Sequence, residues 1–296
     1  MLRDLSNENK GYFFAFIGII LFSITAPATK IALGENNIGL SPAFITFGRS
    51  ALAGILAIIY LVINKKKIPD IKYLNLFIIS ALTLTVGFPI GLSTGLQTST
   101  SVHSAVILAF LPLLTAIFAS FYFKQKVSKF FWYLALTGCL VAIMYSIING
   151  YQKNKNLNFE IADNFFFFAV VSAAIGYTAG VKLTNIFGSV DVICWTLALA
   201  FPFHLLLALN YFPAIEISTY SWVGFLYNAL FSQFIGFFFW YKGLDLGGAV
   251  KVSQVQLLMP FMTFGFSYFL LNETLNFITI IFSLIIILII YFSKKA

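Results

Sequence analysis

Long apolar runs separated by short polar breaks are the dominant pattern of this chain of 296 residues. Each run is close to the 20 or so residues that a helix needs to cross a bilayer, whereas a transmembrane β-barrel would need alternating segments of about ten residues. The pattern predicts ten spanning helices, at 11–33, 42–63, 73–96, 100–123, 129–149, 163–186, 190–211, 221–242, 248–271 and 276–292. We therefore expect an all-α integral membrane protein.

Composition agrees with this interpretation and excludes a soluble chain. Hydrophobic residues make up 60% of the sequence and charged residues only 9%, against about 25% charged residues in an ordinary globular protein. The mean hydropathy is +0.94. A water-soluble core cannot hide so much apolar surface.

The positive charges of the predicted loops are divided unevenly between the two sides. If the N-terminus is cytoplasmic, the loops on that side carry twelve Lys and Arg residues and the other side carries two, Lys153 and Lys155. Because loops rich in Lys and Arg stay in the cytoplasm, we expect a cell (plasma or inner) membrane protein with both termini cytoplasmic. This bias, together with four Lys and Arg residues inside or at the edges of spans, accounts for the net charge of +8, which therefore does not indicate a nucleic-acid partner.

The second half of the chain repeats the first. An offset of 148 residues aligns Pro260 with Pro112 and Lys251 with His103. Since each half has five predicted spans, an odd number, the second copy enters the membrane from the opposite side, and inverted repeats are typical of alternating access. The expected organisation is a cytoplasmic N-terminus at 1–10, repeats at 11–149 and 163–293, an external linker at 150–162 and a cytoplasmic end at 294–296.

One motif occurs in both repeats. It reads GLQTSTSVHSAVILAFLPLLTAIFASFYFKQ at 95–125 and GLDLGGAVKVSQVQLLMPFMTFGFSYFLLNE at 243–273. With this motif the chain resembles the EamA family of the drug/metabolite transporter superfamily. The resemblance implies a ten-helix secondary transporter or exporter of small metabolites, whose central cavity is lined mainly by spans 1, 3, 4, 6, 8 and 9. The acidic position that closes the motif is Gln125 in the first copy and Glu273 in the second.

Charged residues within the predicted spans are the first candidates for contact with a solute, because placing one there costs at least about 2.5–3.5 kcal/mol. His103 and Lys251 begin two Pro-containing helices, and helix N-termini favour anions; the alternatives are a packing histidine and an interface charge. Lys30 and Lys182 lie near span ends, where they either reach the headgroups or contact solute. Arg49 is about eight residues deep in its span, where it binds either a neighbouring helix or the solute.

Uncharged polar and aromatic residues add further candidates. Asn228, Gln233 and Gln256 lie within the eighth and ninth predicted spans. An amide that faces lipid would leave its donors unsatisfied, so these side chains are expected to face a cavity or to join helices. Tyr177 is a candidate stacking wall for a solute. Six residues are candidates for helix packing or gating, through G-x-x-x-G steps or kinks: Gly87, Gly91, Gly95, Pro89, Pro112 and Pro260.

The distribution of buried charge carries two hypotheses. No Asp or Glu is expected in the middle of a span, so coupling through a buried carboxylate has no evident carrier. His103 is then the one buried group expected to exchange protons, and a facilitator or exchanger is favoured. The buried charges are cationic, which favours a solute that bears a carboxylate or phosphate.

The chain has neither an H-E-x-x-H nor a Walker motif, which excludes ATP-driven pumping by this chain alone. No catalytic residue, metal or cofactor is expected. We expect an exporter, facilitator or exchanger of a small polar metabolite, amino-acid-like or organic-anion-like, embedded in the lipid bilayer, with a homodimer as an option. Three alternatives stay open: efflux of drugs or other solutes by the same fold, an intramembrane lipid-modifying enzyme, and a structural membrane subunit.

Overall fold

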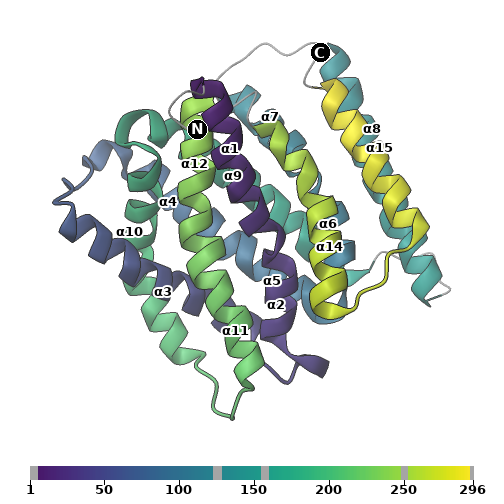
Figure 1. Cartoon of the computed structure of the whole chain (residues 1–296), viewed down its shortest axis with the longest axis horizontal. Helices are drawn as coiled ribbons and strands as arrows, with labels where there is room; N and C mark the ends of the chain where they lie inside the picture. The colour runs from purple at the N-terminus through teal and green to yellow at the C-terminus, as the bar shows by residue number, and fades with distance from the viewer. Residues whose placement is uncertain (1–5, 123–128, 155–159, 248–252, 294–296) are drawn as a thin grey trace.

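The computed structural model describes residues 6–122, 129–154, 160–247 and 253–293, and within these ranges the chain is helical without β-strands (Figure 1). The principal elements are α1 Asn7–Ser23, α2 Thr25–Leu33, α3 Pro42–Ile63, α4 Leu74–Ser80, η3 Ala81–Gly87, α5 Phe88–Thr98, α6 Ser101–Leu108, α7 Leu111–Tyr122, α8 Lys129–Asn154, α9 Ile161–Phe187, α10 Ser189–Asn210, α11 Thr219–Tyr227, η4 Asn228–Ile235, α12 Gly236–Gly247, η5 Ser253–Leu258, α14 Met259–Leu271 and α15 Phe277–Ser293. The segments η3 and η4 are π-helical, and η5 is a 3₁₀-helix.

Several of these helices are long and apolar enough to cross a membrane. The six longest are Asn7–Leu33, Pro42–Ile63, Ile71–Thr98, Ile161–Thr184, Ser189–Asn210 and Thr219–Gly247. The shorter apolar helices in the described ranges are Ser101–Thr115, Val255–Leu271 and Phe277–Ile289. The protein is therefore a multi-pass helical membrane protein, as the hydropathy pattern predicts, while the count of ten spans stays a prediction.

Some helix ends differ from the predicted spans. The first helix begins at Asn7, inside the predicted N-terminal segment, because the Ser6 hydroxyl caps it by accepting from the Asn9 backbone N–H at 3.3 Å. Helix α8 continues to Asn154, inside the predicted linker. Hydropathy marks the part of a helix that crosses lipid, whereas capping decides where the helix itself begins and ends.

Two predicted spans are broken at corresponding places. The fourth span divides into α6 and α7 just before Pro112, and the ninth divides into η5 and α14 just before Pro260. Proline lacks the N–H that a continuous helix needs and clashes with the preceding turn. The third and eighth spans carry the π-helical segments η3 and η4, whose residues align at the same offset of 148. The two halves thus have the same irregularities in the same order.

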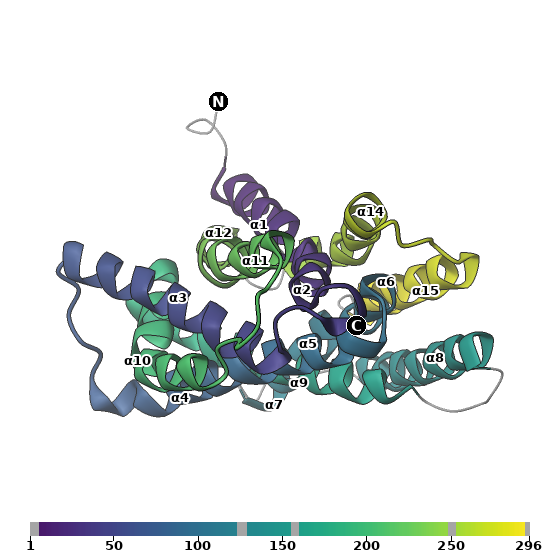
Figure 2. The same cartoon turned by 90° about the horizontal axis from the view of Figure 1, so that it is seen from below.

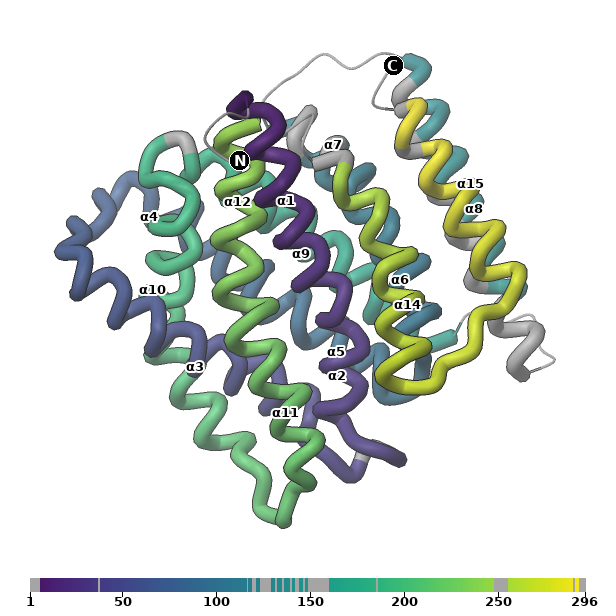
Figure 3. Tube along the Cα trace, in the orientation of Figure 1, coloured from purple at the N-terminus to yellow at the C-terminus, as the bar shows by residue number. Residues whose placement is uncertain are grey.

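The helices form a broad bundle with a packed centre. Helix α1 packs along α12, and α3 packs along α10. Viewed from below, α3 and α10 lie at one edge of the bundle, α8 and α15 at the other, and α5 and α9 between them (Figure 2). The first turn of α1 and the last turn of α15 lie at the same end of the bundle (Figure 3).

Candidate functional site

A cavity lies among the helices that carry these irregularities. It encloses about 430 Å³, part of which is open to solvent, and its walls come from α1, α2, α3, η3, α5, α6, α7, α9, η4, α12 and α14. These are the helices that the family resemblance implies, with α3 added. A neighbouring cavity of about 280 Å³ shares Leu108, Leu111 and Met259 with it. Pro112 and Pro260 line this second space, so both helix breaks border the cavities.

Arg49 is the only charged residue that lines either cavity within the described ranges. It projects from the interior of α3 and is 2% exposed. Its Nη2 donates to Oε1 of Gln233 at 2.6 Å and to Oγ of Ser232 at 3.4 Å, both on η4. Its Nε has no partner among the described residues, and no carboxylate there forms an ion pair with it. Arg49 is therefore a buried cation held by neutral groups.

The contact with Arg49 fixes the orientation of the Gln233 amide. A guanidinium only donates, so the amide oxygen must be the atom that faces it. The Nε2 of Gln233 consequently points elsewhere, and it has no partner in the described chain. The Nε2 of Gln256, which lines the second cavity, and Nε1 of Trp240 also lack partners there. Unpaired donors therefore gather around this region.

Two other candidates have distinct roles. Tyr177 lines the main cavity, with its ring 6.1 Å from that of Phe237 and 6.3 Å from that of Trp240. Asn228 lines neither cavity: it is fully buried, and its Nδ2 donates to Oγ1 of Thr29 at 3.2 Å and to the Gly224 carbonyl at 3.1 Å. Tyr177 is thus part of the cavity wall, and Asn228 joins η4 to α2.

The intramembrane lysines lie away from the cavities. Lys30 binds backbone carbonyls: its Nζ donates to the carbonyls of Leu96 at 2.6 Å and Ser99 at 3.0 Å, at the C-terminal end of α5. These carbonyls are among those that a helix end leaves unsatisfied. Lys182 is exposed, and its Nζ donates to the Tyr122 hydroxyl at 3.1 Å. Lys251 falls outside the described residues.

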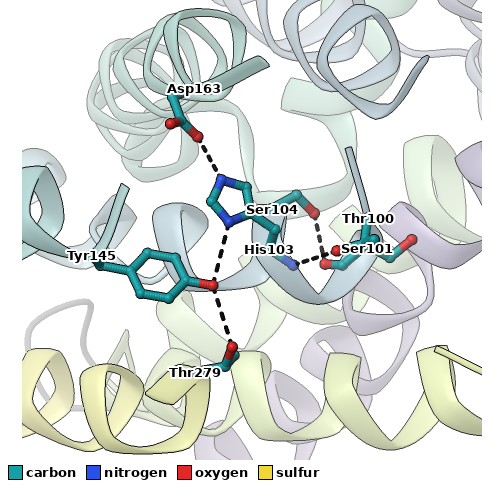
Figure 4. A network of polar contacts seen from close by, with 7 residues as sticks. All are labelled: Thr100, Ser101, His103, Ser104, Tyr145, Asp163 and Thr279. Carbon is teal, nitrogen blue, oxygen red and sulfur yellow. Dashed lines mark hydrogen bonds and ion pairs between the residues drawn. The ribbon is translucent and has the colours of Figure 1, made fainter. Parts of the chain in front are cut away.

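His103 has a carboxylate partner that the sequence analysis missed. Its Nε2 lies 2.5 Å from Oδ1 of Asp163, and its Nδ1 lies 3.3 Å from the Tyr145 hydroxyl (Figure 4). Asp163 is fully buried in the first turn of α9. The sequence indicates no evident carboxylate for coupling in the middle of a span, whereas the structure places a buried carboxylate at the start of one. Asp163 was overlooked because the sixth span was predicted to begin at that residue; an acidic residue in a first turn is a recognisable sequence signal.

A second carboxylate joins the two halves of the chain. The Glu273 side chain accepts hydrogen bonds from the backbone N–H groups of Ser101 at 3.0 Å and Val102 at 2.9 Å. These groups open α6, so the residue that closes the ninth span caps the start of the fourth. The corresponding Gln125 lies outside the described residues.

The three candidate glycines face α9. A Cβ added at Gly91 would lie 2.7 Å from the Phe165 carbonyl oxygen, and one at Gly95 would lie 2.5 Å from the Phe166 ring. At Gly87 the nearest group is the Ser172 side chain. The G-x-x-x-G steps thus allow close helix packing. Pro89 is buried in the first turn of α5, outside both cavity walls.

Known proteins share both the sequence and the fold of this chain. The sequence model of the EamA-like transporter family matches residues 9–147 and again 161–294. The chain is 32% identical over 271 residues to the uncharacterized transporter YdeK of Bacillus subtilis (strain 168), covering 91% of each chain. It is 25% identical to the uncharacterized transporter YyaM of the same organism, over 86% of this chain and 85% of that protein. A solved crystal structure with 13% sequence identity has a TM-score of 0.64 over 97% of this chain and 96% of that one, which indicates the same fold. The chain therefore belongs to the EamA-like transporter family and is a membrane transporter.

Proposed function

We propose that this transporter carries a small organic anion, a carboxylate with an apolar body, through the Arg49 cavity by alternating access. The observation that carries the proposal is the buried guanidinium of Arg49, which lines the cavity and has only neutral partners among the described residues. A buried cation without a counter-charge is costly. A bound carboxylate would supply that counter-charge and accept from the unpaired donors.

The cavity favours an organic anion over an amino acid. The ammonium group of an amino acid needs acceptors, best of all a carboxylate. The described walls of both cavities contain no carboxylate. Phe22, Phe237 and Tyr177 line the main cavity instead and offer an apolar surface to the body of the solute. Of the two solute classes that the sequence left open, the organic anion therefore fits these walls better.

Alternating access is supported by the paired irregularities of the two halves. Interrupted helices at corresponding positions of two repeats are typical of transporter binding sites. Pro112 and Pro260 line the cavity next to that of Arg49. Hydrogen bonds that join the halves lie beside it, such as Thr25 to Ser232 at 2.8 Å and Thr263 to the Ser23 carbonyl at 3.0 Å. Rocking of one half against the other would exchange such contacts. The inverted arrangement, the homodimer and the cytoplasmic termini remain predictions.

Transport by the purified protein in proteoliposomes tests the proposal. The probes are 4-methyl-2-oxopentanoate and leucine, which share a carbon skeleton and differ in a keto or an ammonium group. We expect saturable uptake of the oxo acid, at least about tenfold faster than uptake of leucine, because an unpaired buried ammonium costs more than about 1.4 kcal/mol. Equal transport of leucine would contradict the solute class. Absence of any oxo-acid flux above protein-free vesicles would contradict the function.

Cysteines at two exposed positions test the orientation. Glu35 follows the first span and Lys66 follows the second, so the predicted topology places them on opposite sides. In whole cells an impermeant thiol reagent should label Glu35→Cys and spare Lys66→Cys. The reverse pattern would show that the orientation is opposite to the predicted one. Equal labelling of both variants in intact cells would show that the two positions lie on the same side, which contradicts the predicted topology.

A further inference from the structure

A buried polar network joins the two halves of the chain away from the cavity walls. Nε2 of His103 meets Oδ1 of Asp163 at 2.5 Å, Nδ1 meets the Tyr145 hydroxyl at 3.3 Å, and that hydroxyl lies 3.4 Å from Oγ1 of Thr279 (Figure 4). His103 is 3% exposed and Asp163 is 0% exposed. The imidazole therefore lies between a carboxylate and a phenol, out of contact with bulk water.

The elements around α6 bring few other charged groups to this network. Helix α9 contributes Asp163 and, at its N-cap, Glu160; α8 contributes Tyr145. The end of α14 contributes Glu273 at the N-terminus of α6, and α2 contributes Lys30, which binds carbonyls at the end of α5. The described parts of α5 and α15 bring no charged group to the network: α15 contributes the neutral Thr279. Among the described residues, these elements thus bring three carboxylates and one ammonium to the surroundings.

The charge of the pair depends on a single proton. With a neutral ring, the pair of His103 and Asp163 carries one negative charge at a buried position. With a protonated ring, it becomes an ion pair of zero net charge. Separating a buried ion pair leaves two uncompensated charges, so the two groups must exchange a proton or gain water when they move apart. Proton occupancy is therefore tied to the distance between α6 and α9.

That distance is set by the same helices that form the cavity. His103 lies five residues before Leu108, which lines both cavities, a rise of about 7.5 Å along α6. Helix α9 carries Asp163 at its start and Ala173 and Tyr177 in the cavity wall. Between the pair and the cavity, α6 and α9 meet through buried apolar side chains, including Val106, Phe166 and Ala169. The two helices belong to different family matches.

We infer that the pair of His103 and Asp163 is a proton-binding site that couples proton movement to solute movement. The inference rests on the proposed function, because movement of α6 against α9 would expose the pair and reshape the cavity in one step. The proton is taken from water on one side of the membrane while the helices are apart, is held while they are together, and is released to water on the other side after the two halves have rocked. The transported anion then moves together with one proton, and the cycle is electroneutral. Tyr145 is a positioning residue, since its hydroxyl and stacked ring hold the imidazole.

Accumulation driven by a pH gradient tests the coupling. Proteoliposomes are given 4-methyl-2-oxopentanoate at equal concentration on both sides, with the outside more acidic. Coupling to one proton predicts about tenfold accumulation for each unit of pH difference. Asp163→Asn and His103→Gln should equilibrate the oxo acid without accumulating it. The control is His204→Gln, which removes a second buried histidine, bonded to Thr85 at 3.0 Å, and should accumulate like the wild type.

The outcomes separate the two proposals. Equilibration of the oxo acid by the wild type without accumulation overturns the proton site and leaves the proposed function standing. Accumulation by both Asp163→Asn and His103→Gln at the wild-type level overturns it as well. Absence of any oxo-acid flux overturns the proposed function. The proton site is then decided by ¹⁵N NMR of the imidazoles, whose signals are few because the chain has two histidines. A His103 signal that changes protonation state as the pH is varied supports the site, and an invariant one overturns it.

A folding defect is separated from a loss of coupling by a milder variant. Tyr145→Phe keeps the stacked ring, whose centroid lies 5.2 Å from that of His103, and removes only the hydroxyl. It should retain oxo-acid flux and shift the pH dependence of accumulation. A pH profile identical to that of the wild type would overturn the positioning role of the hydroxyl.

Discussion

Arg49 on α3 donates a 2.6 Å hydrogen bond to the Gln233 side-chain oxygen on the π-helical segment η4. This one contact joins the two halves of the chain and turns the amide nitrogen of Gln233 away from the guanidinium. It also leaves the positive charge of Arg49 without a carboxylate in the described chain. The result is a cavity wall that donates hydrogen bonds and carries positive charge, which is the chemistry that an anionic solute needs.

Replacement of Arg49 by Gln should weaken solute binding more than folding. A hydrogen bond to a charged group contributes about 1.5–3 kcal/mol. We therefore expect the concentration of 4-methyl-2-oxopentanoate that gives half-maximal transport to rise roughly ten- to hundredfold. The thermal midpoint in detergent should change little, because burying the guanidinium is itself costly. Transport assays and thermal unfolding of the same preparation check both parts. An unchanged half-saturating concentration would exclude Arg49 as a solute contact.

Replacement of Gln233 by Glu should raise the stability of the protein and abolish solute transport. The new carboxylate would pair with Arg49 and supply internally the charge that we assign to the solute. We expect a higher thermal midpoint and loss of oxo-acid transport. Asn228→Asp is the matched control, because Asn228 lies on the same segment η4 but lines neither cavity and has no described contact with Arg49. Full transport by Gln233→Glu would contradict the assignment of the cavity.

A methyl group at Gly91 should destabilise the protein. The added Cβ would meet the Phe165 carbonyl oxygen on α9 at 2.7 Å, and overpacking of this kind costs about 1–3 kcal/mol. Gly265→Ala provides the control, since no atom lies within 4 Å of a Cβ added there and alanine favours a helix by about 0.5–1 kcal/mol. Thermal unfolding in detergent should lower the midpoint of Gly91→Ala and leave that of Gly265→Ala equal or higher. Equal midpoints for the two variants would show that α5 and α9 are not in close contact.

Removal of the Glu273 side chain should loosen the start of α6. Its carboxylate accepts from two backbone N–H groups there, and loss of such a cap costs about 0.5–2 kcal/mol. We expect a lower thermal midpoint for Glu273→Ala, together with faster hydrogen exchange in the first turn of α6. Glu35→Ala, at an exposed loop position, should leave both quantities unchanged. Unchanged protection of the first turn of α6 from hydrogen exchange in Glu273→Ala would contradict the capping role.

The ion pair of Lys66 and Asp191 should stabilise the protein in a pH-dependent way. A 2.7 Å contact joins the loop after α3 to the first turn of α10, and the hydrogen bond that the Lys66 ammonium donates to the Asp191 carboxylate raises the Lys66 pKa above its ordinary 10.5. A raised pKa means that the stabilisation is complete below about pH 10.5 and is lost as the pH rises through the higher value. Lys66→Met should therefore lower the thermal midpoint slightly at neutral pH and in low salt, and the difference should disappear in high salt. A difference that is independent of salt would point to packing.

Hydropathy alone was sufficient to predict the fold class and most helix positions. In a chain with 9% charged residues, apolar runs of about twenty residues indicate membrane-spanning segments. Such segments are helical because every backbone group in lipid must be hydrogen-bonded within the protein. Pro112 and Pro260, which the sequence marked as candidates for kinks, lie directly after the points where the fourth and ninth spans divide. Proline lacks the N–H that a continuous helix needs, although α10 continues through Pro202. The family resemblance followed from the motif that surrounds these prolines.

The partners of the buried polar residues were decided by the tertiary structure. Asp163 and His103 are 60 residues apart, and Arg49 and Gln233 are 184 apart, so no local pattern links them. Lys30 shows the same limit: its place in the sequence suited a headgroup contact, yet the fold brings the end of α5 within reach of its ammonium. Apolar runs and proline positions determine the local backbone conformation, so their effect can be predicted along the chain. The partner of a buried charge depends instead on how distant helices pack.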